Sequence, residues 1–298
     1  MNISRFTIFL IIVFSSFKLT AQELAGDEWP DWRGPNRDGT WNEKNVATQF
    51  DGDRLPLKWR VPVSSGYSGP TVAEGRVYIT DRIREPEEME RILCFDAQTG
   101  KEIWSYTYNC VYTGVGYPAG PRASVIVDGN RAFSLGTMGH LFCFDAAEGE
   151  VLWKRSFNEE YELNLPTWGI AAAPLIVDDK VILQIGIGDN GCIIAVDKYT
   201  GREIWRNLED PASYAAPILI EQAGKKVVVV WTGNSVAGLS PDLGTIYWQE
   251  AFRRSKMVIG IATPVYHEGF IFVSSFYNGS MLVQVDPDRL EATTVWHR

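Results

Sequence analysis

The chain has 298 residues, of which 45% are hydrophobic and 22% are charged, a balance typical of a globular protein with a large core. Its 28 Lys and Arg residues are outnumbered by 37 Asp and Glu residues, so the net charge is −9. Such a chain has no basic excess for following nucleic-acid phosphates, and no nucleic-acid partner is expected. The 11 Trp and 27 Gly residues favour many short strands joined by tight turns over long helices.

The first 21 residues are typical of an export signal. A short basic start over residues 1–5 precedes an apolar run over residues 6–17, and Ala21 provides a small residue for cleavage. About twelve apolar residues are too few to cross a bilayer comfortably and fit a secretory signal peptide; the alternative is an uncleaved anchor. We expect cleavage after this segment to leave a monomeric periplasmic or secreted protein with no membrane span. Because Arg5 and Lys18 would be lost with no acid, its net charge would be about −11.

The four cysteines form no redox or metal motif. They lie 16, 33 and 49 residues apart, and no two of them are adjacent or spaced as CxxC. Export makes disulfides chemically feasible, but a chain of this length does not need a disulfide framework. We interpret Cys94, Cys110, Cys143 and Cys192 as small buried apolar residues, and the sequence leaves their disulfide state open.

One segment recurs along the chain and predicts the fold. Each copy ends an apolar run with Asp, reaches Gly four residues later and reaches Trp after four more. Two weaker copies follow, one with Ser240 in place of Asp and one with two extra turn residues after Asp286. The full copies contain Asp96, Gly100 and Trp104, then Asp145, Gly149 and Trp153, then Asp197, Gly201 and Trp205, and the weaker copies end at Trp248 and Trp296.

The spacing of these tryptophans matches one blade of a β-propeller. Counted from Trp59, they lie 45, 49, 52, 43 and 48 residues apart, and a four-stranded blade needs about 40–50 residues. A second hairpin with a Gly or Asp turn precedes each copy, so every period holds four strands. The Asp is expected to accept turn N–H groups, the Gly to adopt a positive φ, and the Trp to pack between neighbouring sheets.

The count gives five complete blades and one unpaired strand. We predict an all-β propeller whose blades span residues 70–104, 123–153, 173–205, 216–248 and 263–296. Residues 57–63 resemble a fourth strand that lacks its first three. We therefore expect a fragment of a ring of about seven or eight blades, with an exposed edge at its last blade; an unusual open or reclosed ring is the alternative.

The repeated hairpins resemble the quinoprotein, or PQQ-like, β-propeller repeat family. Its docking pattern is A-x-D-x-x-T-G-x-x-x-W, and Asp96, Thr99, Gly100 and Trp104 fit it, although the Ala position is displaced. Residues 29–39 resemble the W-x-x-W-R-G-P-x-R-x-G segment that precedes the propeller in exported bacterial members. The resemblance implies an N-terminal arm over residues 22–56 and a propeller over residues 57–298. Those members are similar to BamB, the propeller subunit of the outer-membrane protein assembly machinery, a likeness that implies fold more than activity.

The loops that lead into the first strand of each blade hold the candidate binding residues. First strands line the channel of a propeller, so these loops gather at one mouth. Small residues beside their aromatic side chains leave room for a ligand; alternatively, the aromatic side chains only cover gaps between blades. The predicted rim consists of Tyr67, Tyr117, Trp168 and Tyr214, with Arg122 and Lys256 as donors.

Two charged segments receive a structural interpretation. Arg33 and Arg37 are expected to tie the N-terminal arm to the flank of the propeller. The mixed-charge stretch over residues 82–91 is expected to be a solvated loop that lengthens one turn, with a partner contact as the alternative.

Three functions remain for this chain. The family resemblance implies either a BamB-like binding scaffold or a dehydrogenase that holds PQQ and a calcium ion on the propeller axis, with adjacent cysteines against the quinone. No cysteines are adjacent here, and the turn Gly188-Asp189-Asn190 is the candidate for calcium ligands, with a plain hairpin turn as the alternative. The third function is glycan binding by the aromatic rim.

Catalytic motifs are otherwise missing from the sequence. His140, His267 and His297 lack metal-ligand spacing, and neither a GxSxG elbow nor a phosphate loop is present,. We predict a non-enzymatic, exported scaffold that binds an envelope protein, a peptide or a glycan, without catalytic residues, metal or cofactor.

Overall fold

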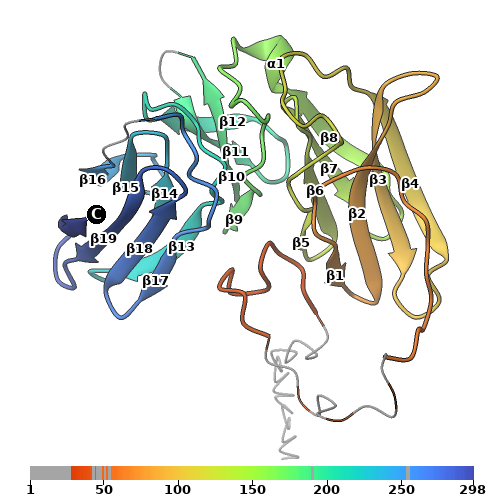
Figure 1. Ribbon diagram of the computed structural model, residues 1–298, viewed down its shortest axis with the longest axis horizontal. Coiled ribbons are helices and arrows are strands. Elements are labelled where there is room, and N and C mark those ends of the chain that lie inside the picture. The colour runs from red at the N-terminus through yellow and green to blue at the C-terminus, as the bar shows by residue number, and fades with distance from the viewer. Residues whose placement is uncertain are drawn as a thin grey trace, which may run out of the picture.

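The protein is a β-propeller built from four-stranded blades, as the repeat predicts. The computed structural model describes residues 28–41, 44, 49, 52, 55–188, 191–252 and 256–298, so the predicted signal peptide lies outside the described residues. Within them, five antiparallel sheets each hold four strands in chain order. The sheets follow one another around an open arc, with the first and fifth blades at its two ends (Figure 1). No helix in these ranges is long and apolar enough to span a membrane.

Each predicted blade is present, and its fourth strand continues one to five residues beyond the repeated Trp. A short helix, α1 (Phe157–Glu160), follows the second blade. The strands of the first two blades are β1 (Thr71–Ala73), β2 (Arg76–Ile83), β3 (Met89–Asp96), β4 (Glu102–Asn109), β5 (Ile126–Asp128), β6 (Arg131–Leu135), β7 (His140–Asp145) and β8 (Val151–Ser156). Those of the last three are β9 (Leu175–Val177), β10 (Lys180–Ile187), β11 (Gly191–Asp197), β12 (Glu203–Asn207), β13 (Ile218–Gln222), β14 (Lys225–Trp231), β15 (Ser235–Leu239), β16 (Ile246–Ala251), β17 (Val265–His267), β18 (Phe270–Ser275), β19 (Gly279–Val285) and β20 (Ala292–His297).

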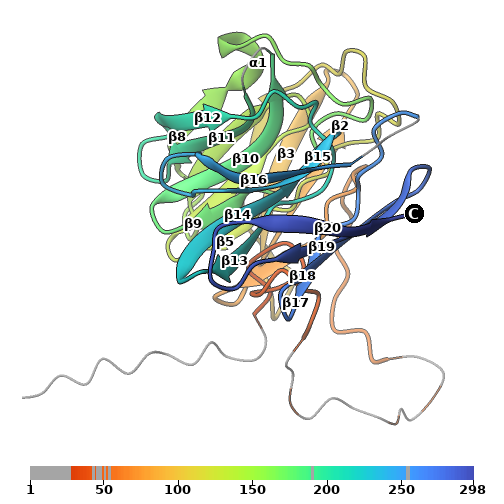
Figure 2. The same cartoon turned by 90° about the vertical axis from the view of Figure 1, so that its left-hand side faces the viewer.

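The core lies between consecutive blades. Four clusters of buried apolar side chains each join one blade to the next, and Figure 2 shows the sheets stacked as neighbouring layers. Among the described residues, none of these clusters joins the first blade to the fifth. The outer face of the fifth blade therefore leaves Val265 49% exposed and Phe272 38% exposed.

An indole from one blade packs on the Asp-to-Gly turn of the next blade. Its Nε1 donates to the main-chain carbonyl of the residue after the Asp or Ser that opens the turn. This bond turns an apolar contact into one with a fixed direction. The pairs are Trp104 with Ala146 at 3.0 Å, Trp153 with Lys198 at 3.0 Å and Trp205 with Pro241 at 2.8 Å.

The turn glycines permit this contact for two reasons. Gly149 has a φ of 74° and Gly201 a φ of 71°, in the left-handed region that glycine enters without strain. A Cβ at Gly149 would also lie 2.5 Å from the Trp104 ring. The Asp holds the turn in shape, because Asp197 Oδ1 accepts the N–H of Thr200 at 2.7 Å.

The start of the propeller departs from the prediction. Residues 57–63 form no strand, because the described residues include no neighbouring strand that would complete a hydrogen-bonded ladder with them. Trp59 nevertheless occupies the docking position on the first blade, where its Nε1 donates to Ala97 O at 3.0 Å and its ring covers Gly100.

The longer turn of the fifth blade is accommodated by a glutamine. Trp248 Nε1 donates to Gln222 Oε1 at 2.9 Å. The Nε2 of Gln222 in turn donates to Asp286 O, Arg289 O and Glu291 O at 2.7–3.1 Å. The amide therefore spans the gap that the lengthened turn opens. Trp296 has no such turn against it in the described part of the chain.

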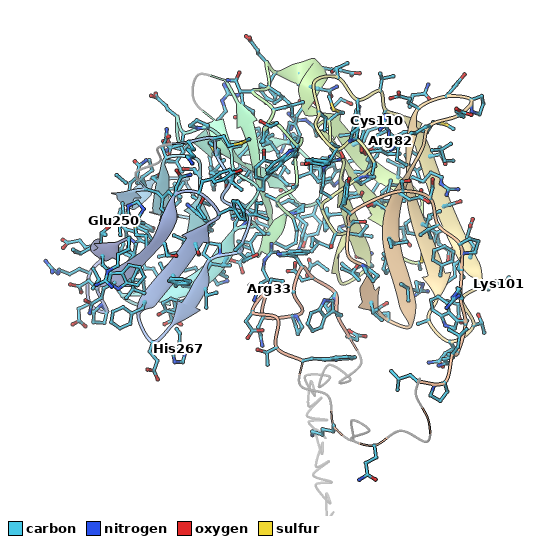
Figure 3. The ribbon with its side chains drawn as sticks, viewed as in Figure 1. Arg33, Arg82, Lys101, Cys110, Glu250 and His267 are labelled. Carbon is cyan, nitrogen blue, oxygen red and sulfur yellow. The ribbon has the colours of Figure 1, made fainter. Side chains whose placement is uncertain are left out.

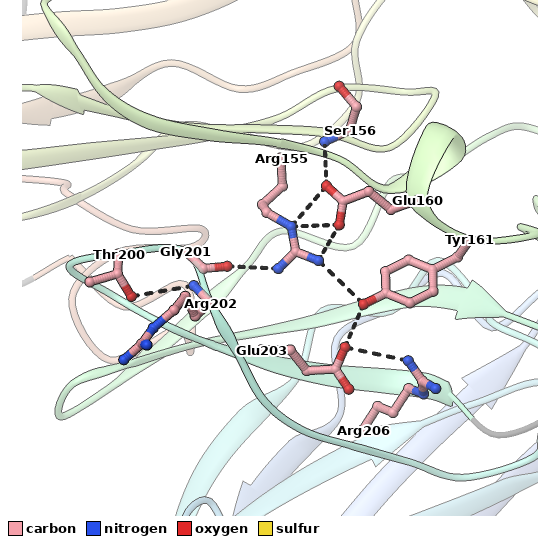
Figure 4. Close-up of polar contacts among 9 residues, drawn as sticks. All are labelled: Arg155, Ser156, Glu160, Tyr161, Thr200, Gly201, Arg202, Glu203 and Arg206. Atoms are coloured by element: carbon pink, nitrogen blue, oxygen red, sulfur yellow. Dashed lines mark hydrogen bonds and ion pairs between the residues drawn. The ribbon is translucent and has the colours of Figure 1, made fainter.

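A polar cluster links the outer edges of the second and third blades (Figure 4). Arg155 of β8 binds the Glu160 carboxylate with Nε at 2.7 and 2.8 Å and donates to Gly201 O at 2.7 Å. It also donates to the Tyr161 hydroxyl, which donates to Glu203 of β12. These contacts hold α1 over the interface.

The N-terminal arm over residues 28–41 crosses the end of the channel that carries the Asp-to-Gly turns, which we call the lower mouth (Figure 1). Trp29 and Val72 of β1 exchange two backbone hydrogen bonds, at 2.7 and 2.9 Å, and Val127 N of β5 donates to Pro30 O at 2.8 Å. Trp32 Nε1 donates to Thr263 Oγ1, next to the fifth blade, at 2.8 Å. The arm thus connects blades from both ends of the arc.

Arg37 anchors the arm from inside the propeller. It is 5% exposed and donates to Asp31 Oδ1 at 2.6 Å, Pro174 O at 2.7 Å and Ala173 O at 3.2 Å. The expected contact with the flank is therefore wrong for Arg37, because its acceptors are carbonyls beside the innermost strand β9. Arg33, labelled in Figure 3, donates within the arm, to Asp38 O.

All four cysteines are buried free thiols, in agreement with their interpretation as small apolar residues. Burial raises the pKa of the Cys94 thiol and of the Cys143 thiol to about 12. The thiolate is the reactive form, so these side chains are inert while the protein is folded.

We predict that Trp104→Ala lowers the free energy of unfolding by about 3–5 kcal/mol, because it removes a buried ring and leaves a cavity. Trp296→Ala is the matched control, since this ring covers no turn among the described residues, and about 1 kcal/mol or less is expected. Urea unfolding followed by circular dichroism measures both. Equal losses would contradict the docking role.

We predict that Arg37→Ala costs about 3–5 kcal/mol, because it leaves the partly buried Asp31 carboxylate without its cation and two buried carbonyls without their donor,. Arg33→Ala in the same arm removes one partly exposed hydrogen bond and should cost about 1 kcal/mol or less. Thermal unfolding of the two variants checks this difference. A similar loss in both variants would contradict the anchoring role of Arg37.

We predict that a thiol reagent labels none of the four cysteines in the folded protein and all four after unfolding in guanidinium chloride. Burial blocks both access and ionisation in the native state. A colorimetric thiol titration gives the count, and fewer than four thiols after unfolding would indicate a disulfide.

Candidate functional site

Five of the six predicted rim residues line one pocket at the opposite end of the channel, which we call the upper mouth. The pocket has a volume of about 330 Å³, and its walls are almost entirely apolar. Its residues come from the loops that lead into all five first strands. They are Tyr67, Tyr117, Arg122, Trp168, Ala171, Tyr214 and Ile261.

Lys256, the sixth predicted residue, lies apart from this pocket. Its Nζ is 5.0 Å from the centre of the Tyr277 ring, and its backbone N–H donates to Asn278 Oδ1 at 3.2 Å. The β18–β19 turn thus holds the start of the loop away from the channel. The same loop reaches the pocket five residues later, through Ile261.

Hydrogen bonds between successive mouth loops hold the pocket in shape. Tyr67 N donates to Pro121 O at 2.8 Å, Gly116 N to Thr167 O at 2.7 Å and Tyr214 N to Gly260 O at 2.9 Å. Trp168 N donates to the Tyr214 hydroxyl at 3.3 Å. Each loop is therefore bonded to the next, which indicates a site formed before any ligand arrives.

The exposed fraction of the aromatic side chains increases from the floor of the pocket to its rim. Trp168 and Tyr214 lie with ring centres 5.0 Å apart, and Tyr117 lies 6.3 Å from Trp168. Tyr214 is 6% exposed, whereas Tyr67 is 53% and Tyr117 71% exposed. Tyr117 also has a φ of 50°, an uncommon conformation for a residue with a side chain.

Arg122 fixes the loop that carries Tyr117. Its guanidinium donates to Tyr117 O at 2.7 Å and Gly116 O at 3.1 Å, and also to Gly120 O. It lies over the ring of Tyr67, 5.2 Å from the ring centre. Burial lowers the pKa of Arg122, although a guanidinium remains charged at neutral pH. Its guanidinium donates to these three carbonyls, so Arg122 acts as a fixed charge more than as the free donor that the sequence suggested.

A buried carboxylate supports Arg122 from below. Glu90 is 1% exposed and accepts hydrogen bonds from the hydroxyls of Tyr108 and Tyr112. Tyr112 also bonds Thr137 Oγ1 at 2.6 Å, and Thr137 Oγ1 lies 3.5 Å from Arg122. Burial, followed by the charge of Glu90, raises the pKa of Tyr112, so the phenol stays protonated and donates.

The charged stretch over residues 82–91 is the expected solvated loop only in its middle. Residues 84–87 are exposed and lie between β2 and β3, whereas Arg82 at the end of β2 is 3% exposed and Glu90 at the start of β3 is 1% exposed. Figure 3 labels Arg82 and Cys110 in this region. The alternation of side chains along β3 could have predicted the burial of Glu90, because Glu90 lies on the same face of the strand as the buried residues Ile92 and Cys94,.

The described donors do not match a quinone and calcium site. Calcium takes roughly 6–8 oxygen ligands, whereas the described lining residues include a guanidinium and no carboxylate. No group of three or more His, Cys, Asp or Glu side chains in the described ranges is arranged to hold a metal. Asp189 and Asn190, in the candidate calcium turn, lie outside the described residues.

Comparison with solved structures supports the propeller fold. A quinohemoprotein alcohol dehydrogenase from Pseudomonas putida HK5 is 16% identical with a TM-score of 0.60, over 91% of this chain and 48% of its own. BamB from Moraxella catarrhalis is 16% identical with a TM-score of 0.52, over 81% of this chain and 63% of its own. A europium-containing methanol dehydrogenase is 15% identical with a TM-score of 0.52, over 82% of this chain and 54% of its own. This chain thus spans about half to three fifths of the length of these structures.

Sequence comparison identifies the family. No curated protein matches the chain. The family described as outer membrane protein assembly factor BamB matches residues 88–298, which include the last two strands of the first blade and all of the later blades. The chain therefore belongs to this family of PQQ-like propeller repeats.

Proposed function

We propose that the protein is an exported, non-enzymatic scaffold that binds a partner polypeptide in the aromatic pocket of the upper mouth. The observation that carries this proposal is the convergence of side chains from five mouth loops on one apolar hollow. The family description, an outer-membrane protein assembly factor, and the signal-like segment over residues 1–21 support a partner in the cell envelope.

The chemistry of the walls favours a polypeptide side chain over a sugar. Sugars carry many hydroxyl groups, and each must keep a hydrogen-bond partner when it leaves water. The pocket presents almost no polar surface, and Arg122 already donates to three carbonyls. A large apolar side chain needs only the apolar contact that the aromatic walls supply.

The bonded loops favour a binding role as well. A site that is already ordered loses little conformational entropy when a ligand arrives. The described pocket residues offer no general base and no activated nucleophile within the lining, which are the groups that a catalytic site requires. A dehydrogenase that uses PQQ and calcium is the alternative function. It is tested as well, because the fold is similar to those of two dehydrogenases.

We predict that the protein binds peptides containing one large apolar residue and that Trp168→Ala weakens this binding at least about tenfold, because the floor of the pocket is lost. Tyr67→Ala, at an exposed rim position, should weaken it about threefold or more. Tyr199→Ala, which removes a 55% exposed ring in the turn after Asp197, is the matched control and should change nothing. A peptide array followed by calorimetry on purified variants measures these effects.

Two parallel measurements test the other functions. Glycan-array binding that Trp168→Ala abolishes, with no peptide binding, would replace the proposal with carbohydrate recognition. A rise in melting temperature on adding PQQ and calcium together, with neither effective alone, would replace it with the dehydrogenase function.

A further inference from the structure

We propose that the pocket recognises a large apolar residue lying next to a carboxylate, supplied by the C-terminus of the partner polypeptide or by an Asp or Glu side chain in it. The inference rests on the proposed function and adds the chemistry of the partner. Both sources offer the same pair of groups, an apolar side chain and one negative charge a few ångströms away.

The pocket contains a positive charge. Arg122 is the one charged residue among the described residues of the lining. Arg37, Arg82 and Arg155, which are also buried or nearly so, each pair with a carboxylate within 4 Å. No such pair is found for Arg122 among the residues that the structure describes. Its positive charge therefore remains uncompensated at short range, on the wall of an apolar hollow.

The hydrogen bonds of Arg122 hold its guanidinium in place without neutralising its charge. The guanidinium donates to the carbonyls of Gly116, Tyr117 and Gly120, which fix its position but carry no net charge. Its nearest negative support, Glu90, lies behind Thr137 and Tyr112. A cation held in place at the edge of a low-dielectric site exerts its field on a ligand without first paying to be ordered.

The charge of the pocket is opposite in sign to the net charge of the chain. The whole protein carries a net charge of −9, so its general field repels anionic partners at long range. Within the pocket, the local field has the opposite sign, and none of the described lining residues is a carboxylate. A carboxylate is therefore favoured only close to Arg122, beside the apolar anchor of the ligand, and a cation at the same place is disfavoured.

Matched peptides test the inference. The first pair is acetyl-Gly-Ser-Gly-Ser-Phe with a free C-terminal carboxylate and the same peptide with a C-terminal amide. The second pair is a doubly capped peptide with an internal Asp-Phe and its Asn-Phe counterpart. We expect the charged member of at least one pair to bind about 3- to 10-fold more tightly at low salt and less than about twofold more tightly in roughly 0.5 M salt, because screening weakens the attraction.

Substitutions assign the preference to Arg122. The charged-to-neutral binding ratio should fall to about one in Arg122→Gln, remain above one in Arg122→Lys, which keeps the charge, and stay unchanged in Lys256→Gln, which removes a cation outside the pocket. This ratio separates charge recognition from loop support, because a loosened loop weakens both members of a pair alike. If Arg122→Gln binds neither peptide, the ratio in Arg122→Lys decides.

The outcomes distinguish a failure of this inference from a failure of the proposed function. Equal binding of both members in both pairs, or a preference that survives in Arg122→Gln, overturns the inference and leaves the peptide-binding function standing. A failure of all four peptides to bind at millimolar concentration overturns the proposed function and the inference with it. A preference in one pair alone supports the inference and identifies the source of the carboxylate.

Discussion

The contact between a tryptophan ring and a glycine turn is the constraint on which the whole structure depends. A sheet of four short strands cannot bury both of its faces alone, so each blade requires a neighbour. The indole supplies apolar area, and its N–H requires one particular carbonyl, as Trp104 and Ala146 show. The same bond therefore sets both the packing of two neighbouring blades and their relative orientation, and it recurs along the chain.

The same constraint explains why both ends of the arc look different from its middle. Trp59 fills the docking position of the first blade from a segment that is not itself a strand. At the other end, Gln222 replaces the direct bond where the turn after Asp286 is longer. Hydrogen-bond geometry is thus preserved where the backbone changes, because a buried indole N–H without an acceptor is costly.

The two mouths of the channel have become chemically distinct. The lower mouth is crossed by the arm, whose Arg37 and Trp32 reach carbonyl and hydroxyl groups beside the third and fifth blades. The upper mouth carries bonded loops around an apolar pocket that holds one cation. This difference between the two mouths favours a scaffold that binds its partner at the upper mouth, with the arm as a fixed part of the fold.

The repeat and its blades follow from the amino-acid sequence alone, because the Asp, Gly and Trp positions act through local turn geometry and a fixed spacing. The sequence also predicted one shared site for Tyr67, Tyr117, Arg122, Trp168 and Tyr214, since loops at equivalent places in each repeat must gather at one mouth. The neighbours that these side chains contact became known from the folded structure. In the folded structure, Lys256 lies outside the pocket, and Arg122 is a hydrogen-bonded charge and not a free donor. Glu90 is buried beneath Arg122, and Arg37 lies inside the propeller. Those outcomes depend on contacts between residues far apart in the chain, such as Glu90 with Thr137 and Arg37 with Pro174, and periodicity within a blade carries no information about them.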